Sequence, residues 1–228
     1  MIKYALIGGR SISNLYNPCL EEKIFESLNI NNPNILFFPF ACINDMEKSC
    51  NKFIKLMESV SCNIECICDI EDINKVATLI KWADVLYFGG GHSEDLISAM
   101  KKINLKSFDL DNKLLCGISA GSIMLSKSGM GDKYIYANNN HLYNYKMVDG
   151  LNFLDITVCP HYDHDGLLVY NDDVKNYNCS GFGIEDDTAI IIYNNKVIPV
   201  KQDLSKSIYY FNKENNYELI SLYKELEM

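Results

Sequence analysis

Positive charge is scarce in this sequence. Its 228 residues include 21 Lys or Arg against 30 Asp or Glu, a formal net charge of -9, and Arg10 is the only arginine. Nucleic-acid grooves and anionic membrane surfaces attract clusters of Lys and Arg. The composition therefore argues against nucleic acid or a membrane surface as a partner, and it leaves a single guanidinium for binding a carboxylate.

Long apolar runs and an export signal are also missing. No stretch approaches the roughly 20 apolar residues of a membrane span, and the opening MIKYALIGG has the pattern of a strand, without a basic segment or a cleavage site. We therefore expect a cytoplasmic protein whose nine cysteines stay reduced. Cys62, Cys66 and Cys68 have no histidine or second cysteine pair nearby, so we interpret them as small buried residues. We expect no metal and no other cofactor.

Short apolar runs alternate with helical patterns in the first half of the chain. The runs predict strands at 2–7, 35–40, 64–68, 85–88 and 114–118. The patterns between them predict helices at 18–28, 45–60, 72–82 and 93–103. This alternation predicts βαβ crossovers and an α/β fold, with a mainly parallel sheet flanked by helices on both faces.

Beyond Ser119 the pattern changes. We predict a short helix at 121–127, a loop rich in Gly and Asn at 129–144, a strand at 156–159 and a helix from Asp165 to Tyr177. The tail predicts a C-terminal antiparallel extension, with strands at 188–193, 196–200, 207–211 and 217–223. Since no linker or repeat interrupts the chain, we expect residues 1–228 to form one domain.

The most informative motif is GISAG at 117–121, a G-x-S-x-G segment between a predicted strand and a predicted helix. Small residues allow a tight turn that exposes the hydroxyl of Ser119, while the amide of Ala120 points toward a developing oxyanion. We predict Ser119 as a nucleophile. The alternative is a turn that serves packing alone.

The base must come from one of four histidines. His161 ends a predicted strand in the segment CPHYD, and open parallel sheets assemble their sites at the carboxyl ends of strands. We therefore predict His161 as the base. A glycine run at 89–91 follows another strand, and we expect Gly90 or Gly91 to supply a second oxyanion amide.

Three segments in this order, YFGGGHSEDL, GISAGSIML and CPHYD, resemble the serine peptidases typified by aspartyl dipeptidase (dipeptidase E) and cyanophycinase. The resemblance spans residues 1–193. It implies a class I glutamine-amidotransferase-like fold and hydrolysis of small peptides, often next to an acidic residue, without metal or cofactor. It also implies the nucleophile Ser119, the base His161, and oxyanion donors at Gly90 or Gly91 and at Ala120.

The acidic member of the triad stays open. Related sequences place an acid soon after the nucleophile helix, and Asp132 is the only acid between Ser119 and Asp149. Glu185, in GIEDDTAI, resembles another acidic segment of the family and is the alternative. Arg10, at the end of the first predicted strand, is the candidate for binding a substrate carboxylate, unless it is a solvated loop residue or caps a helix carboxylate.

Two other functions are open on the sequence. An α/β-hydrolase esterase shares the elbow, but its histidine usually lies late in the chain, whereas the last histidine here is His164. A non-catalytic binding module on the amidotransferase-like fold would keep the elbow without hydrolysis. For a peptidase, the expected partner is a small peptide, bound by a monomer or a homodimer.

Overall fold

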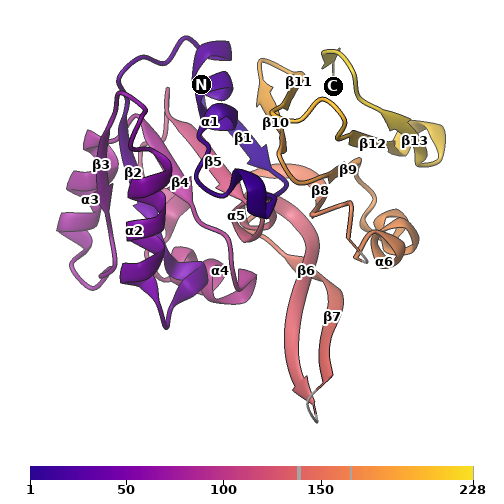
Figure 1. The fold of residues 1–228 in the computed structure, drawn as a ribbon, viewed down its shortest axis with the longest axis horizontal. Coiled ribbons are helices and arrows are strands. Elements are labelled where there is room, and N and C mark those ends of the chain that lie inside the picture. Colours follow the sequence, from indigo (N-terminus) through magenta and orange to yellow (C-terminus); the bar gives the residue numbers. More distant parts are fainter. Residues whose placement is uncertain (138–139, 165, 228) are drawn as a thin grey trace.

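The fold is built on two sheets. The computed structural model describes residues 1–137, 140–164 and 166–227, and their side chains except those of residues 132–144, 166 and 167. The larger sheet has eight strands in the order β14-β11-β10-β1-β5-β4-β2-β3 (Figure 1). The smaller has six, in the order β13-β12-β9-β8-β6-β7.

Five parallel strands form one half of the larger sheet. They are β1 (Lys3–Ile7), β5 (Leu114–Ile118), β4 (Val85–Phe88), β2 (Asn34–Phe38) and β3 (Asn63–Cys66). The helices between them are α1 (Cys19–Ser27), α2 (Met46–Leu56), α3 (Ile73–Trp82) and α4 (Ser93–Lys102). The βαβ alternation expected from the sequence is confirmed, with shifts of a few residues at the ends of the elements.

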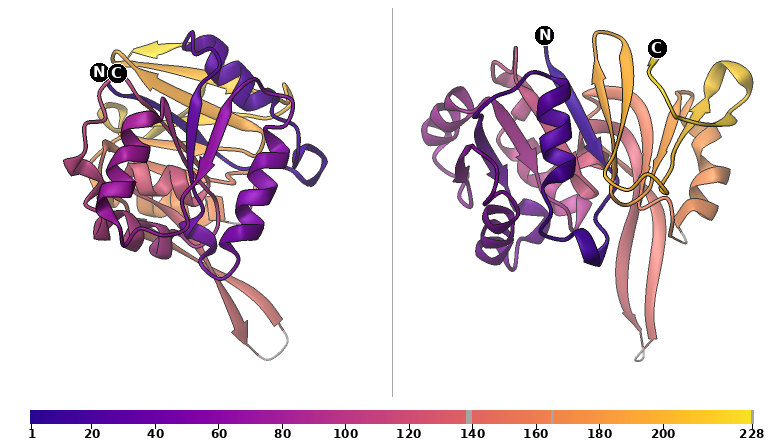
Figure 2. Two further views of the ribbon diagram at one scale, coloured as in Figure 1. Left: turned by 90° about the vertical axis from the view of Figure 1, so that its left-hand side faces the viewer. Right: turned by 45° about the horizontal axis from the view of Figure 1, so that its top comes forward.

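Helices cover both faces of this parallel half (Figure 2). Successive strand side chains point to opposite faces, so Leu6 packs into the core beneath α3 and α4, while Ala5 and Ile7 pack with α1 and α2. The strands β1, β5, β4 and β2 are largely buried and mostly apolar, whereas the edge strand β3 is partly exposed and contains Asn63 and Glu65.

The other half of the larger sheet is antiparallel. Here β10 (Thr188–Tyr193) pairs with β1, β11 (Lys196–Lys201) pairs with β10, and β14 (Leu226–Glu227) pairs with β11. Asn194 and Asn195 join β10 to β11 with φ of 52° and 59°. Two positive φ angles match a type I′ hairpin turn, which asparagine tolerates well. This is the expected C-terminal antiparallel extension.

The smaller sheet contains the main departure from our expectations. Its strands are β6 (Ser126–Ala137), β7 (Asn140–Asp149), β8 (Leu154–Pro160), β9 (Gly181–Ile184), β12 (Ile208–Asn212) and β13 (Glu218–Ser221). The predicted loop at 129–144 is wrong, since β6 and β7 pair antiparallel there. We gave weight to Gly and Asn, but the segments KYIY and HLYNY are rich in Tyr and Ile, which favour strands.

A short helix, α5 (Ala120–Leu125), ties the two sheets together. Ser122 Oγ donates to the carbonyl oxygens of Ile7 and Gly117, at 2.8 Å each, which fixes α5 against β1 and β5. A second helix, α6 (Gly166–Asp173), precedes β9, and its predicted start at Asp165 lies outside the described residues. Every helix in the described part of the chain is too short or too polar to cross a membrane.

Candidate active site

Ser119 occupies a sharp turn between β5 and α5. Its backbone has φ of 52° and ψ of -110°, a conformation that L side chains rarely adopt. Such backbone strain costs on the order of 1–3 kcal/mol, and neighbouring contacts must maintain it. One is the bond from Ser119 N to Ile7 O at 3.0 Å. Another is the close approach of Gly117 to Gly121, where a Cβ atom would collide with backbone. This is the backbone geometry of a nucleophile elbow.

His161 lies directly opposite Ser119, although it comes from the other sheet. It follows the last residue of β8, and its Nε2 atom lies 2.9 Å from Ser119 Oγ. Its Nδ1 atom lies 2.6 Å from Oδ1 of Asp186. An ionised carboxylate only accepts hydrogen bonds, so Nδ1 donates to Asp186, and in the neutral ring Nε2 is then the acceptor for the hydroxyl of Ser119. This tautomer leaves the base ready to receive a proton.

The acid beside His161 is therefore Asp186, in the segment between β9 and β10. Of the two acids expected from the sequence, Glu185 faces another partner, since its Oε2 accepts from Ser207 N at 2.8 Å. The side chain of Asp132 lies outside the described residues. Our alternative, Glu185, lies in the segment GIEDDTAI, but the adjacent Asp186 makes the contact with His161, because neighbouring side chains in extended backbone point in opposite directions.

Residues that we did not predict hold Asp186 in place. Gly9 forms an isolated bridge with Asp186, and Asp187 N donates to Gly9 O at 3.0 Å. A Cβ atom at Gly9 would collide with Asp186 Oδ1 and with the ring of His161, so only glycine fits there. The buried carboxylate of Asp187 accepts from Ser11 N at 3.2 Å and from Asn14 Nδ2 at 3.0 Å. The pair Gly8-Gly9 after the first strand was the available sequence signal.

The glycine run after β4 lies against Ser119. A Cβ atom at Gly90 would come within 3.4 Å of Ser119 Cβ. Cys42 Sγ donates to Gly90 O at 3.3 Å, and His92 N donates to Ala41 O at 2.7 Å, so the turn is fixed on both sides. Gly91 has φ of 134°, which favours glycine. Within the described chain, the amides of Gly90 and Gly91 have no internal acceptor.

Comparison with protein families identifies the family of the chain that carries this site. The model of peptidase family S51 matches residues 5–200. The chain belongs to this family of serine peptidases. Membership makes the chain a peptidase, with a peptide as its substrate, and gives it the class I glutamine-amidotransferase-like fold that the resemblance implied.

Two solved structures share the fold of this S51 chain. A peptidase from an acI-B1 Actinobacterium superposes with a TM-score of 0.72 at 16% identity, covering 99% of this chain and 96% of that one. A protein of Listeria monocytogenes EGD-e, provisionally named peptidase E, has a TM-score of 0.64 at 22% identity, covering 89% and 100%. At these identities the similarity concerns the fold. No curated protein matches the chain.

Arg10 lies near this site but faces the interior. Its guanidinium forms an ion pair with Glu21 of α1 and donates to Asn17 O at 2.8 Å, and its side chain is only 5% exposed. Tyr87 OH donates to the same carboxylate at 2.7 Å. Burial lowers the pKa of Arg10, but the charge of Glu21 outweighs that effect and the net pKa rises, so the ion pair stays charged. The only arginine is thus bound within the protein.

The neighbours of His161 restrain its loop. Asp163 Oδ1 accepts from Asp186 N at 3.2 Å, and Asp163 also forms an ion pair with Lys206. Burial raises the pKa of Asp163, but the bonds from Lys206 and from the Asp186 amide outweigh it and lower the net pKa. Burial raises the pKa of Tyr162 to about 12, so its hydroxyl stays protonated. Asp163 is thus an anion that orients the backbone of Asp186.

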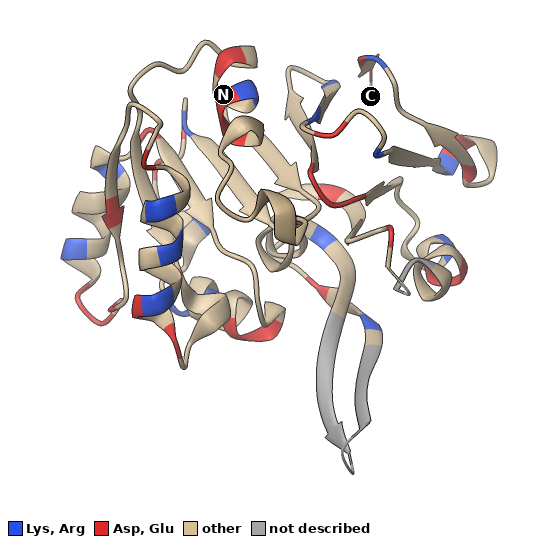
Figure 3. Cartoon of the chain, viewed as in Figure 1, with Lys and Arg blue, Asp and Glu red and all other residues tan. Residues whose placement is uncertain are grey.

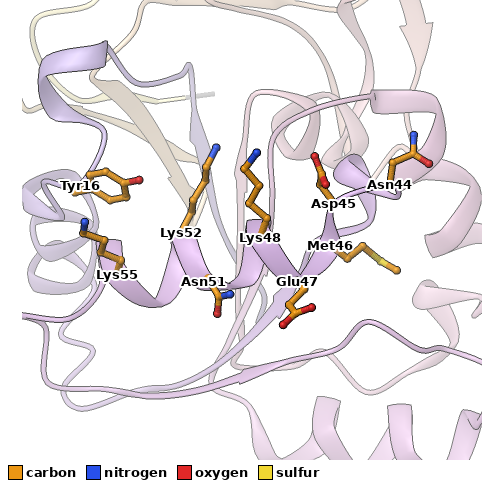
Figure 4. Close-up of a pocket in the computed structure, with 9 residues that line it drawn as sticks. All are labelled: Tyr16, Asn44, Asp45, Met46, Glu47, Lys48, Asn51, Lys52 and Lys55. Carbon is orange, nitrogen blue, oxygen red and sulfur yellow. The ribbon is translucent and has the colours of Figure 1, made fainter.

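A hollow of about 590 Å³ lies along α2 (Figure 4). Its lining residues are Tyr16, Asn44, Asp45, Met46, Glu47, Lys48, Asn51, Lys52 and Lys55. Lys48, Lys52 and Lys55, spaced at i, i+4 and i+7, form the row of basic residues on α2 that is visible in Figure 3. Lys55 Nζ lies 4.5 Å from the centre of the Tyr16 ring. Of the lining residues, Tyr16 lies in the connection between β1 and α1, and Asn44 lies in the connection between β2 and α2.

Proposed function

We propose that this chain hydrolyses small peptides through a triad of Ser119, His161 and Asp186 and an acyl-enzyme intermediate. The observation that supports it best is the unbroken series of contacts from Ser119 Oγ to His161, at 2.9 Å, and on to Asp186, at 2.6 Å. These lengths suit direct proton transfer without an intervening water. The proposal puts Asp186 in the role that we expected for Asp132 or Glu185.

In the proposed reaction, Ser119 Oγ attacks the carbonyl carbon of the scissile peptide bond while His161 Nε2 takes the hydroxyl proton. The resulting imidazolium is stabilised by Asp186, whose side chain is 9% exposed and therefore little hydrated. The amide of Ala120, together with that of Gly90 or Gly91, donates to the oxyanion. His161 then protonates the leaving amine, and a water molecule activated by His161 hydrolyses the ester.

Because Arg10 is paired with Glu21, another residue must supply the positive charge that binds an acidic side chain of the substrate. Lys48 and Lys52 line the hollow along α2, and neither forms an ion pair among the described residues. Cys42, just before this stretch, contacts the glycine run beside Ser119. We therefore assign Lys48 and Lys52 as the residues that favour a peptide with a negatively charged side chain.

A fluorophosphonate probe tests the nucleophile. The wild type is expected to be labelled at one serine, and Ser119→Ala is expected to abolish labelling and peptide hydrolysis together. Comparing a dipeptide library with nitrophenyl esters separates a peptidase from an esterase. Absence of labelling in a folded wild type would favour the non-catalytic binding module instead.

The lysine assignment is tested with Asp-X and Ala-X dipeptides. Replacing Lys48 and Lys52 by alanine is expected to lower kcat/KM about tenfold for Asp-X and little for Ala-X, since charge-assisted contacts contribute roughly 1.5–3 kcal/mol. Lys75→Ala is the matched control, because this exposed lysine on α3 lies on the opposite face of the sheet. Equal losses for both dipeptides would remove the lysines from substrate recognition.

A further inference from the structure

A second histidine stands beside the acid of the proposed triad. His164 Nε2 lies 3.3 Å from Asp186 Oδ2, whereas His161 Nδ1 contacts Oδ1 of the same carboxylate. The rings of His161 and His164 have their centres 5.3 Å apart. One ligand atom from each of these three residues can be chosen so that all lie within 4.8 Å of one another. Of these three residues, the proposed hydrolysis uses His161 and Asp186 but not His164, so His164 is the one available for another role.

We propose that His161, His164 and Asp186 form an inhibitory site for a zinc ion. Two imidazoles and one carboxylate form a typical three-ligand zinc set, with the fourth position open to water. Hard cations such as Mg²⁺ and Ca²⁺ prefer a full set of oxygen ligands, which this cluster does not offer. The chemistry of the donors therefore selects a borderline ion over the abundant hard ones.

The geometry needs only a small adjustment to bind the ion. Zinc bonds of about 2.0–2.2 Å in a tetrahedron separate the ligand atoms by roughly 3.3 Å. The contact between His164 and Asp186 already has this length, at 3.3 Å. His161 Nδ1 and Asp186 Oδ1, now 2.6 Å apart, must separate to admit the ion. With side chains 52% and 33% exposed, His164 and His161 leave a path from solvent.

A neighbouring ion pair lies beside the cluster. Asp163 Oδ1 lies 4.0 Å from His164 Nε2, while Lys206 forms an ion pair with the same carboxylate group and the amide of Asp186 donates to it. Because Lys206 balances the charge of Asp163, the carboxylate of Asp186 supplies the negative charge that a zinc ion meets in this cluster.

Zinc binding would stop the proposed reaction through the tautomer of His161. In the free protein the single ring proton sits on Nδ1, and Nε2 accepts from Ser119. Nδ1 can bind the metal only through its lone pair, so the proton moves by way of solvent to Nε2, with no net proton released. A protonated Nε2 cannot take the proton of Ser119. This inhibitory consequence depends on the proposed function, whereas zinc binding itself does not.

The inference is tested by titrating the full-length protein with zinc in two assays, isothermal calorimetry and dipeptide hydrolysis. Each variant is compared with its own metal-free rate. His164→Gln is expected to raise the half-inhibitory zinc concentration at least about tenfold, since even outer partners of zinc ligands contribute 10–100-fold in affinity. The same variant is expected to lose one calorimetric binding site.

Two controls address other zinc ligands. His92→Gln removes a similarly exposed histidine beside Asp95 and Glu94, and Cys68→Ser removes an exposed thiol 3.6 Å from that of Cys50. Both variants are expected to keep wild-type inhibition. The inference is overturned if His164→Gln is inhibited like the wild type, if either control relieves inhibition, or if zinc binds through His164 without slowing hydrolysis. If the metal-free wild type hydrolyses no dipeptide but still binds zinc through His164, the proposed function is rejected and the zinc site is not.

Discussion

Replacing Asp186 by asparagine removes one charge with almost no change in shape. The NH₂ group of the asparagine faces either His161 or His164. When it faces His161, it donates to Nδ1, so Nδ1 must act as an acceptor. The ring proton then moves to Nε2, and the base can no longer accept from Ser119. In a Ser-His-Asp triad this change lowers kcat about 10⁴-fold, or roughly 5.5 kcal/mol of transition-state stabilisation. We expect a loss of that order for Asp186→Asn.

Two acids that the sequence offered serve as matched controls for this variant. Glu185→Gln changes the adjacent acid, whose carboxylate accepts from Ser207 N, and Asp132→Asn changes the acid that the sequence favoured. Both are expected to keep kcat within about threefold of wild type. Single-turnover rates on a chromogenic dipeptide measure the losses, while circular dichroism verifies the fold. A larger loss for either control than for Asp186→Asn would refute the assignment of the acid.

Further predictions concern residues around the triad. Ser119→Ala and His161→Ala are each expected to lower kcat by about 10⁴ or more, with no further loss in the double variant, because the two groups act as one unit. Gly9→Ala is expected to lower kcat much more strongly than it lowers the melting temperature, since the new methyl group displaces His161 from the acid. Arg10→Ala is expected to cost roughly 3–5 kcal/mol in urea unfolding, because it leaves the buried charge of Glu21 unpaired; Arg10→Ala combined with Glu21→Gln should recover part of that loss.

Local signals account for the part of the structure that the sequence predicted. Most strands of the parallel half are short apolar runs, which is the pattern expected for strands buried on both faces. The position of Ser119 follows from small residues between a strand and a helix. His161 was found because a polar residue at a strand end lies at an edge where sites form. None of these inferences required knowledge of which strands are neighbours.

Contacts between distant segments explain what the sequence did not predict. The choice between Glu185 and Asp186 depends on which side of an extended segment faces β8. Both residues are acidic and adjacent in the sequence, so residue type alone does not distinguish them. For Arg10, the deciding contact is the ion pair with the buried carboxylate of Glu21, which lies on α1. In both cases the partner that decides the contact lies on another element. Periodicity and motif spacing describe only local segments, so they do not predict such a contact.

The location of the proposed triad explains why both sheets matter for activity. Ser119 follows a strand of the larger sheet, and His161 follows a strand of the smaller one. The segment with Asp186 crosses from β9 back to β10, and its bridge to Gly9 joins it to β1. A small relative shift of the sheets therefore separates the nucleophile from its base, even though strands of both sheets contribute to one hydrophobic core, which includes Leu6, Val158 and Ile184. Since proton transfer tolerates far less displacement than apolar packing does, we expect changes at this junction to affect catalysis before they affect stability.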